Sequence, residues 1–200
     1  MKIYNYILLG CLISSSFACS DILNKKDLSA VTEEDVWNDS KYATAYLDKL
    51  CRDNLPDWDA GVANNSDEAN GGDGIMYGQL TTSSIDTWNY EQIRKINLLL
   101  QKVGSGSIDE ETQNTLKAQA LVLRAWRYFQ MVRLYGGVPL ILEPQELTDD
   151  LYVTRAKTSE CIAQMVKDLD DAIAILPWKW TGDDEGRVTK AAAMAFKGRI

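Results

Sequence analysis

A long polar stretch, residues 55–86, holds most of the residues that suggest a binding site. It shows no sustained hydrophobic period and is rich in Gly, Asn, Asp and Ser, yet large aromatic residues occur in it and directly after it. Loops of this length are uncommon in compact domains and are often functional. Aromatic rings offer faces on which a ligand can stack, and amide or carboxylate groups offer hydrogen-bond partners for a polar ligand. The expected ligand contacts are Trp58, Asn64, Asp67, Tyr77 and Trp88.

The acidic residues of the same stretch allow a second interpretation. Asp67, Glu68 and Asp73 offer the oxygen ligands that a calcium ion prefers. Their spacing differs from the EF-hand loop, in which acids alternate and a Glu closes the loop. We therefore predict neither a metal site nor another cofactor, and calcium remains the alternative.

The residues that catalysis would need are scarce. The chain has no histidine, which removes the commonest general base, the Ser-His-Asp triad and most zinc sites. A glycosidase would still be possible with two carboxylates roughly 5–9.5 Å apart across a cleft. The best candidates, Asp168, Asp170 and Asp171, fall on one predicted helix, and such a group more often forms a solvated acidic face. The prediction is that the protein is not an enzyme.

The first residues predict an export signal. Lys2 gives a short positive region, and residues 3–18 are mostly apolar or small. A membrane-spanning helix needs roughly 20 apolar residues, so this segment is too short to span stably. Ala18 precedes Cys19, which fits cleavage after residue 18 and attachment of lipid to Cys19. A soluble periplasmic protein with an unmodified cysteine is the alternative, whereas lipidation at Cys11 would leave too short an apolar region.

This interpretation divides the chain into a signal peptide (1–18), a lipidated tether (19–30) and a folded domain (31–200). Without the signal peptide, Lys2 is lost from the 21 basic residues, so 20 basic face 29 acidic side chains and the net charge is −9. No basic stretch stands out, and a nucleic acid is therefore not an expected partner. Charge would not hold the protein to an anionic membrane either, so the anchor must be the lipid.

Hydrophobic periods and chain breakers divide the domain into five expected helices with almost no strand pattern. The third, which Ser107 and Glu110 open as a capping box, is apolar on two sides and should be central and buried. Residues 140–142 form a short extended run. Helix pairs of this kind can stack into a solenoid, although the tetratricopeptide consensus is only loosely met. The helices are expected at about residues 33–55, 87–103, 107–135, 158–176 and 189–200.

The last of these helices is expected to continue to Ile200, without a stop signal. We therefore expect the sequence to be the N-terminal part of a longer protein.

Five separate segments resemble the SusD/RagB family of nutrient-binding lipoproteins. The most specific reads LRAWRYF and then VRLYGGVPLI, close to the family pattern, whereas in the second segment Tyr90 follows Trp88 by two residues where the family has three. The order of the segments holds through the whole chain. They are residues 19–23, 88–97, 123–141, 155–177 and 186–193.

The resemblance implies an all-α body of tetratricopeptide-like helical pairs with long loops. It also implies a lipid-anchored position on the outer face of the outer membrane, over a SusC-like TonB-dependent transporter. The expected ligand is an oligosaccharide or polysaccharide, and family members often place their sugar contacts in the region of residues 55–88. The alternative is a tetratricopeptide-like lipoprotein adaptor that binds only protein partners, which would not need the aromatic residues of that region.

Overall fold

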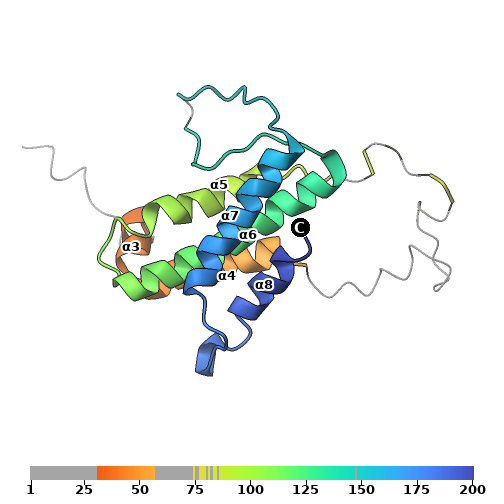
Figure 1. The fold of residues 1–200 in the computed structure, drawn as a ribbon. Helices are drawn as coiled ribbons and strands as arrows, with labels where there is room; N and C mark the ends of the chain where they lie inside the picture. The colour runs from red at the N-terminus through yellow and green to blue at the C-terminus, as the bar shows by residue number, and fades with distance from the viewer. Residues whose placement is uncertain are drawn as a thin grey trace, which may run out of the picture. The chain divides into compact units, whose positions relative to one another are not determined.

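The computed structural model describes residues 31–56, 74, 77–79, 81, 83–84, 86–146 and 148–200. Every regular element among these residues is helical, which confirms the all-α prediction (Figure 1). The chain forms two units, Met1–Thr32 and Glu33–Ile200, and nearly all described residues belong to the second. Several predictions concern residues outside the described ones: the signal peptide, the tether with Cys19, the sugar contacts Trp58, Asn64 and Asp67, and the possible calcium ligands Glu68 and Asp73.

The helices follow the predicted order, but their ends differ from the predictions by a few residues. No helix in the described ranges is long and apolar enough to cross a membrane. The elements are α3 (Glu33–Asn38), α4 (Ser40–Asn54), α5 (Tyr90–Lys102), α6 (Glu110–Tyr135), α7 (Thr158–Ile175), the short 3-10 helix η3 (Gly182–Asp184) and α8 (Lys190–Lys197).

The first expected helix is in fact two, because Asp39 interrupts it. Its backbone is extended (φ −122°, ψ 119°), and its carboxylate accepts a hydrogen bond of 2.8 Å from the backbone N–H of Lys41. A side-chain acceptor at this position satisfies one of the free N–H groups of the first helical turn, which is why Asp favours helix starts. The turn places Trp37 in the core, edge-on to Tyr46 with ring centroids 5.4 Å apart.

The predicted capping box at Ser107 is wrong. Asp109 caps α6 instead, since its carboxylate accepts a hydrogen bond of 2.8 Å from the N–H of Thr112. Ser107 bonds to the preceding part of the fold: its N–H donates to Oδ1 of Asn38 and its hydroxyl to the Asn38 carbonyl. The start of α6 is therefore determined by a contact between residues 69 positions apart and not by the local sequence pattern.

The predicted run of the last helix to Ile200 is also wrong. Helix α8 ends at Lys197, and Gly198 is its C-cap, with its N–H bonded to the carbonyl of Met194.

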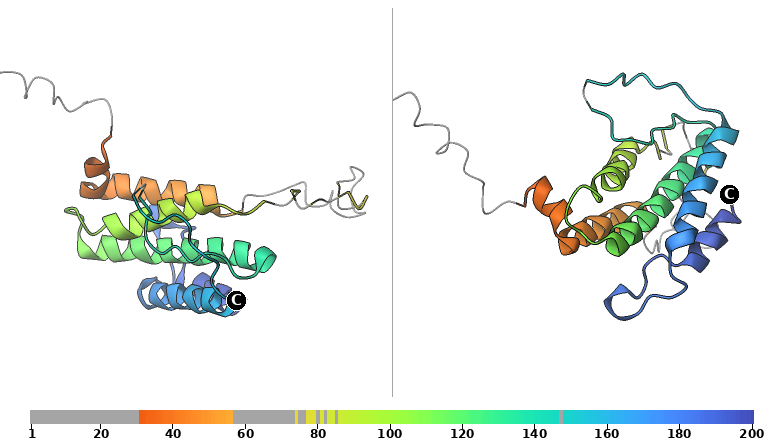
Figure 2. Two further views of the ribbon diagram at one scale, coloured as in Figure 1. Left: turned by 90° about the horizontal axis from the view of Figure 1, so that it is seen from above. Right: turned by 60° about the vertical axis from the view of Figure 1, so that its left-hand side comes forward.

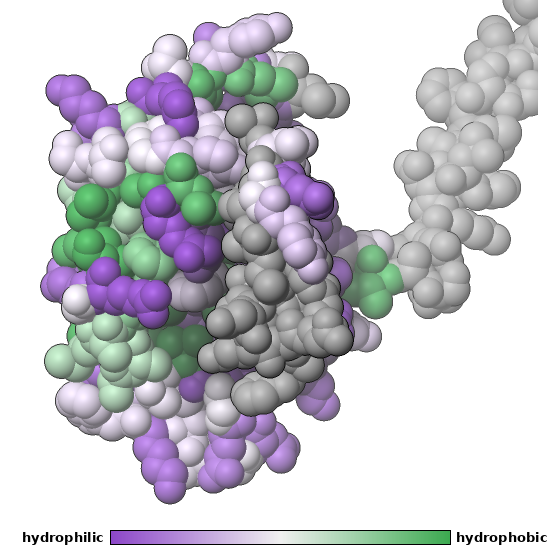
Figure 3. All heavy atoms as spheres, turned by 90° about the vertical axis from the view of Figure 1, so that its right-hand side faces the viewer, coloured by the Kyte–Doolittle hydropathy of each residue, from purple (hydrophilic) through white to green (hydrophobic). Residues whose placement is uncertain are grey.

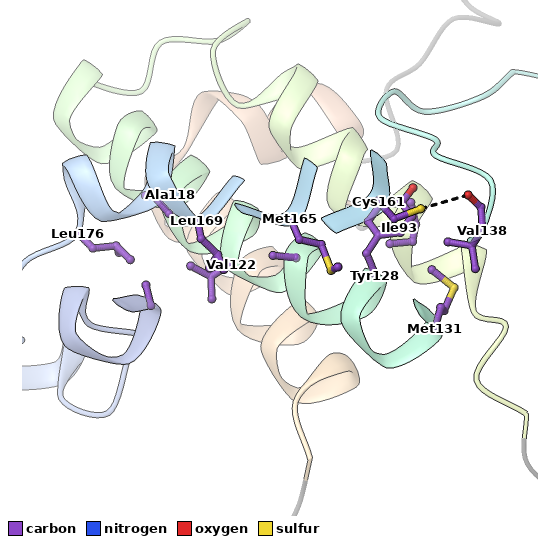
Figure 4. Packing of buried hydrophobic residues seen from close by; sticks show 13 residues of the cluster. Ile93, Ala118, Val122, Tyr128, Met131, Val138, Cys161, Met165, Leu169 and Leu176 are labelled. Carbon is purple, nitrogen blue, oxygen red and sulfur yellow. Dashed lines mark hydrogen bonds between the residues drawn. The ribbon is translucent and has the colours of Figure 1, made fainter. Parts of the chain in front are cut away.

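The third expected helix, α6, is central as predicted. It contacts α4, α5 and α7, and Figure 2 shows it running between the α4–α5 pair and α7. One of its apolar faces packs mainly with α7, as Figure 4 shows, and the other packs with α4 and α5. Burying one large apolar side chain stabilises a fold by about 1.5–3 kcal/mol, so two such faces make α6 the main hydrophobic contact of the unit. The first face contributes Ala118, Val122, Ala125, Tyr128 and Met131, and the second contributes Leu116, Ala120 and Leu123.

A buried ion pair joins α6 to α7. The guanidinium of Arg124 bonds both carboxylate oxygens of Asp168, each at 2.8 Å, and also donates to Oδ1 of Asn97 in α5. Gln164 donates a further bond of 2.7 Å to Asp168, whose side chain is 1% exposed. The predicted solvated acidic face is therefore wrong for Asp168, because that carboxylate neutralises a buried arginine; Asp171 does lie at the surface, paired with Lys167.

The segment after α6 is extended, and side chains rather than a partner strand hold it. Gly136 ends the helix with φ of +71°, a conformation that favours glycine. The hydroxyl of Tyr128 donates to the carbonyl of Ile141 at 2.9 Å and accepts from its N–H at 2.8 Å. Asn97 donates a second bond to the same carbonyl, at 2.9 Å. Residues 140–142 are thus fixed against α5 and α6 without forming a sheet.

Candidate binding surface around Trp88

Trp88 lies where the N-terminus of α5 meets the C-terminus of α6. Its ring makes edge-on contacts with two tyrosines, Tyr90 at 5.3 Å and Tyr135 at 5.2 Å between centroids. The guanidinium of Arg155, from the segment before α7, lies over the ring at 5.7 Å. Edge-on aromatic pairs and cation–π contacts each add stability beyond the area they bury. We call Trp88, Tyr90, Tyr135 and Arg155 the Trp88 surface.

Hydrogen bonds to the backbone fix the surroundings of Trp88. The Tyr135 hydroxyl accepts from the N–H of Thr87 at 3.1 Å, and the Tyr90 hydroxyl donates to the carbonyl of Pro139 at 2.8 Å. Burial raises the pKa of Tyr90 well above its ordinary value, so its hydroxyl stays protonated and remains a donor. Arg155 donates to the carbonyl of Tyr135 at 2.9 Å. Trp88 itself stays 44% exposed, which makes it a large ring that is fixed yet open to a ligand.

A hollow of about 430 Å³ adjoins this surface and shares Tyr90 with it. Its lining combines the apolar side chains of Ile141 and Leu151 with polar ones such as Glu91 and Arg94. Arg94 reaches across the hollow, donating to the carbonyl of Gln145 at 3.1 Å and lying 3.6 Å from the Glu146 carboxylate. Small-molecule sites combine apolar and aromatic lining with placed polar groups, and this hollow offers both kinds of side chain.

The structure describes two of the five residues predicted to contact a sugar. Trp88 has the expected character, a large ring exposed beside polar groups. Tyr77 is 64% exposed in a turn with Gly78. Nothing in the described part of the chain brings Tyr77 to Trp88, so the two are separate features.

Sequence reasoning missed Tyr90, Tyr135 and Arg155 as neighbours of Trp88. All three stand in segments that resemble the SusD/RagB family, but the resemblance gave no indication that they meet. One signal was available in the sequence: each of these residues stands at the end of a predicted helix or in the segment before one. Only the packing of α5 on α6 brings them together.

Exposed apolar side chains do not by themselves identify a site in this molecule. On the face that Figure 3 shows, apolar residues form patches separated by hydrophilic ones. Tyr152 is nearly fully exposed, and Trp178 is largely exposed with Lys190 over its ring at 5.7 Å, yet no aromatic ring among the described residues packs on either of them as two tyrosines do on Trp88. Scattered exposure of this kind is normal for a protein surface.

The family described as "Starch-binding associating with outer membrane", a SusD-like family, matches residues 14–200. A SusD-like protein of Formosa agariphila is 27% identical over the whole chain, which spans 43% of that protein. A SusD-like protein of Bacteroides ovatus is 30% identical over 48% of the chain and 17% of its own length. The chain thus spans less than half of these relatives.

Solved structures show the same fold. A SusD-like protein of Bacteroides fragilis superimposes with a TM-score of 0.72 at 26% identity, covering 88% of this chain and 37% of the other. A laminarin-binding SusD-like protein superimposes with a TM-score of 0.66 at 25% identity, covering 81% of this chain and 39% of the other.

Proposed function

This chain belongs to the SusD-like (SusD/RagB) family, and from that premise we propose that it captures a glycan at the cell surface. In the proposal, a lipid on Cys19 anchors it to the outer membrane, and it delivers oligosaccharide to a SusC-like TonB-dependent transporter without acting as an enzyme. The family is one of carbohydrate-binding proteins, and one of the similar structures is of a laminarin-binding protein. The transporter and the surface position are proposed from the family, and the anchor is proposed from the family together with the export signal that ends at Ala18 and Cys19.

The observation that carries the proposal for this chain is the Trp88 surface. A sugar ring can stack on the exposed part of Trp88, while Arg155 and the polar side chains of the adjoining hollow bond its hydroxyls. Each such hydrogen bond contributes a net of about 0.5–1.5 kcal/mol. Binding in the micromolar to millimolar range, about −8 to −4 kcal/mol, is sufficient for a receptor that must release its ligand again.

The site also fits binding better than hydrolysis. Asp168 cannot act as an acid or nucleophile across a cleft, because Arg124 and Gln164 hold its carboxylate in the core. Asp170 and Asp171, the other two candidates, are at the surface and paired with Lys197 and Lys167. These three carboxylates therefore do not face one another across a binding site.

Replacing Trp88 with Ala is expected to weaken oligosaccharide binding about tenfold, since a fixed aromatic ring supplies contact area at little entropy cost. Titration calorimetry of the full-length protein against an oligosaccharide panel that includes laminarin fragments measures this loss. The matched control is Trp178→Ala, which removes an exposed tryptophan outside the Trp88 surface. The Tyr77→Ala and Trp58→Ala variants test the other two predicted rings.

Undiminished binding in all of the Trp88, Tyr77 and Trp58 variants would overturn the proposed site. Absence of binding to any sugar by the wild-type protein, with a protein partner captured instead, would favour the adaptor alternative. Because Trp88 packs on two tyrosines, the melting temperature of each variant must be measured alongside the affinity.

Replacing Cys19 with Ala is expected to release the protein from the membrane fraction, because the lipid would be the only anchor. The measurement is membrane fractionation with detection of the protein by immunoblot, and Cys11→Ala is the matched control that should leave the protein in the membrane. A Cys19→Ala protein that still sediments with outer membranes and carries an acyl chain would refute the assignment.

A further inference from the structure

A polar cleft runs along the first half of α6, on the side where the loop after α7 approaches α4. It consists of adjoining hollows of about 720, 380 and 350 Å³. The first two adjoin, because they share the lining residues Glu111, Thr115, Trp180 and Asp184. Gln119 and Arg187 line both the second and the third. We call this space the Trp180 cleft.

The cleft is separate from the Trp88 surface. Trp88 contacts Tyr135 at the C-terminal end of α6, whereas the cleft lies along residues 110–119 at the other end. Twenty residues separate Thr115 from Tyr135, and an α-helix rises about 1.5 Å per residue, so roughly 30 Å lie between the two sites.

The wall opposite α6 is held in place by specific contacts. Arg187 bonds Asp48 of α4 at 2.6 Å and Asp184 of the loop at 2.5 Å. The indole N–H of Trp180 donates to the carbonyl of Val188 at 2.8 Å. The ring of Trp180 therefore has a fixed position in the cleft, as a stacking platform requires.

The floor contains a buried polar atom that lacks a partner. Gln119 is 2% exposed, and its amide nitrogen makes one long bond of 3.5 Å to the carbonyl of Thr115. Its side-chain oxygen has no hydrogen-bond partner among the described residues. Leaving a buried acceptor unsatisfied costs free energy, and a bound species that donates a hydrogen bond to it would remove that cost.

We propose that the Trp180 cleft is a second carbohydrate site, which takes a neutral, polyhydroxylated sugar ring stacked on Trp180 and donating a hydroxyl to Gln119. An anion does not fit, because Asp109, Glu111 and Asp184 line the cleft and Arg187 is already paired twice. An ammonium ion can only donate hydrogen bonds, so it would offer no acceptor to the hydrogen-bond donors of the cleft. These donors are the hydroxyls of Ser40, Thr44, Thr112 and Thr115.

The first experiment removes the unpartnered acceptor. Gln119→Leu keeps the side chain's bulk but loses the amide, so the melting temperature should stay the same or rise. Sugar binding at the cleft should nevertheless weaken about tenfold. Saturation-transfer NMR on the full-length protein measures it, with glucose, galactose, mannose and laminarihexaose as probes. A purely structural Gln119 would instead give a lower melting temperature and unchanged transfer.

The second experiment tests the ring and separates the two sites. Trp180→Leu should abolish transfer to the cleft-bound sugar, and Trp178→Leu, two residues away and outside the cleft lining, should not. Saturation transfer to the sugar should persist in the Trp88→Ala variant and disappear when Trp180→Leu is added to it. This result supports a second site even if the Trp88 surface proves not to bind sugar.

Three results would overturn the proposal. The Trp88→Ala variant, with the cleft unchanged, could show no saturation transfer to any of the four sugars. Tetramethylammonium, used as a probe for a cation site, could bind in the cleft and be displaced by none of the four sugars. Or the Gln119→Leu and Trp180→Leu variants could both bind sugar as tightly as their parent.

Discussion

Replacing Arg124 with Ala is expected to lower the free energy of unfolding by about 3–5 kcal/mol, the usual cost of leaving one member of a buried ion pair alone. The Asp168 carboxylate would lose two hydrogen bonds of 2.8 Å in a place where water cannot replace them. The amide oxygen of Asn97 and the carbonyl of Leu142 would lose the same donor group. Urea unfolding followed by circular dichroism measures the change.

Two variants show whether the loss comes from the pair. Arg133→Ala removes an exposed arginine from the same helix, and a surface change of this kind should stay within about 0.5 kcal/mol. The double variant Arg124→Met with Asp168→Leu removes both charges together and should recover much of the stability, as other buried pairs do. An Arg124→Ala protein as stable as the wild type would mean that the carboxylate is not held in the core.

Replacing Gly137 with Ala is expected to destabilise the protein by roughly 3 kcal/mol, the upper end of the usual cost of overpacking. The added Cβ would lie 2.0 Å from the backbone oxygen of Ala156 and 3.2 Å from the backbone nitrogen of Thr158. Backbone atoms cannot rotate away as a side chain can, so the two segments must separate. Differential scanning calorimetry gives the change in stability.

The same change should also disturb the Trp88 surface. The carbonyl of Val138 accepts a hydrogen bond of 3.1 Å from the N–H of Ala156, directly beside Arg155. Moving this contact moves the guanidinium off Trp88, so tryptophan fluorescence should change together with stability. Gly104→Ala is the control, because its nearest neighbour is the flexible end of Lys117, 3.2 Å away. Equal stability of the two variants would contradict the close approach at Gly137.

The helices and the central place of α6 were predictable because they depend on hydrophobic period and on breakers, both of which are local. The apolar residues on two sides of α6 indicated its burial, and the structure fills both sides. The ends of helices were less predictable. Asp39 begins a new helix inside the first predicted one, and Asp109 supplies the cap that the pattern assigned to Ser107. Asp and Ser both suit a helix start, and only the contact of Ser107 with Asn38 decides between Ser107 and Asp109.

The candidate sites were predictable only in part, because they depend on contacts between distant segments. Trp88 was chosen for its aromatic ring in a polar region, but its neighbours Tyr135 and Arg155 lie 47 and 67 positions later in the sequence. Gln119 gave no signal at all, since a glutamine on a helix is ordinarily at the surface and nothing local reveals that its oxygen is unpartnered. Asp168 was wrongly placed on a solvated acidic face for the same reason, because only the packing of α7 on α6 brings its carboxylate to Arg124.

The two-sided burial of α6 has a thermodynamic consequence. Its residues belong to both hydrophobic clusters, so melting either cluster exposes one face of the helix that supports the other. Partial opening is thereby penalised, and the helices in contact with α6 unfold as one cooperative unit rather than pair by pair. The terminal helices α3 and α8 pack mainly on α4 and α7, so they can still open from an end, as the end repeats of a solenoid do.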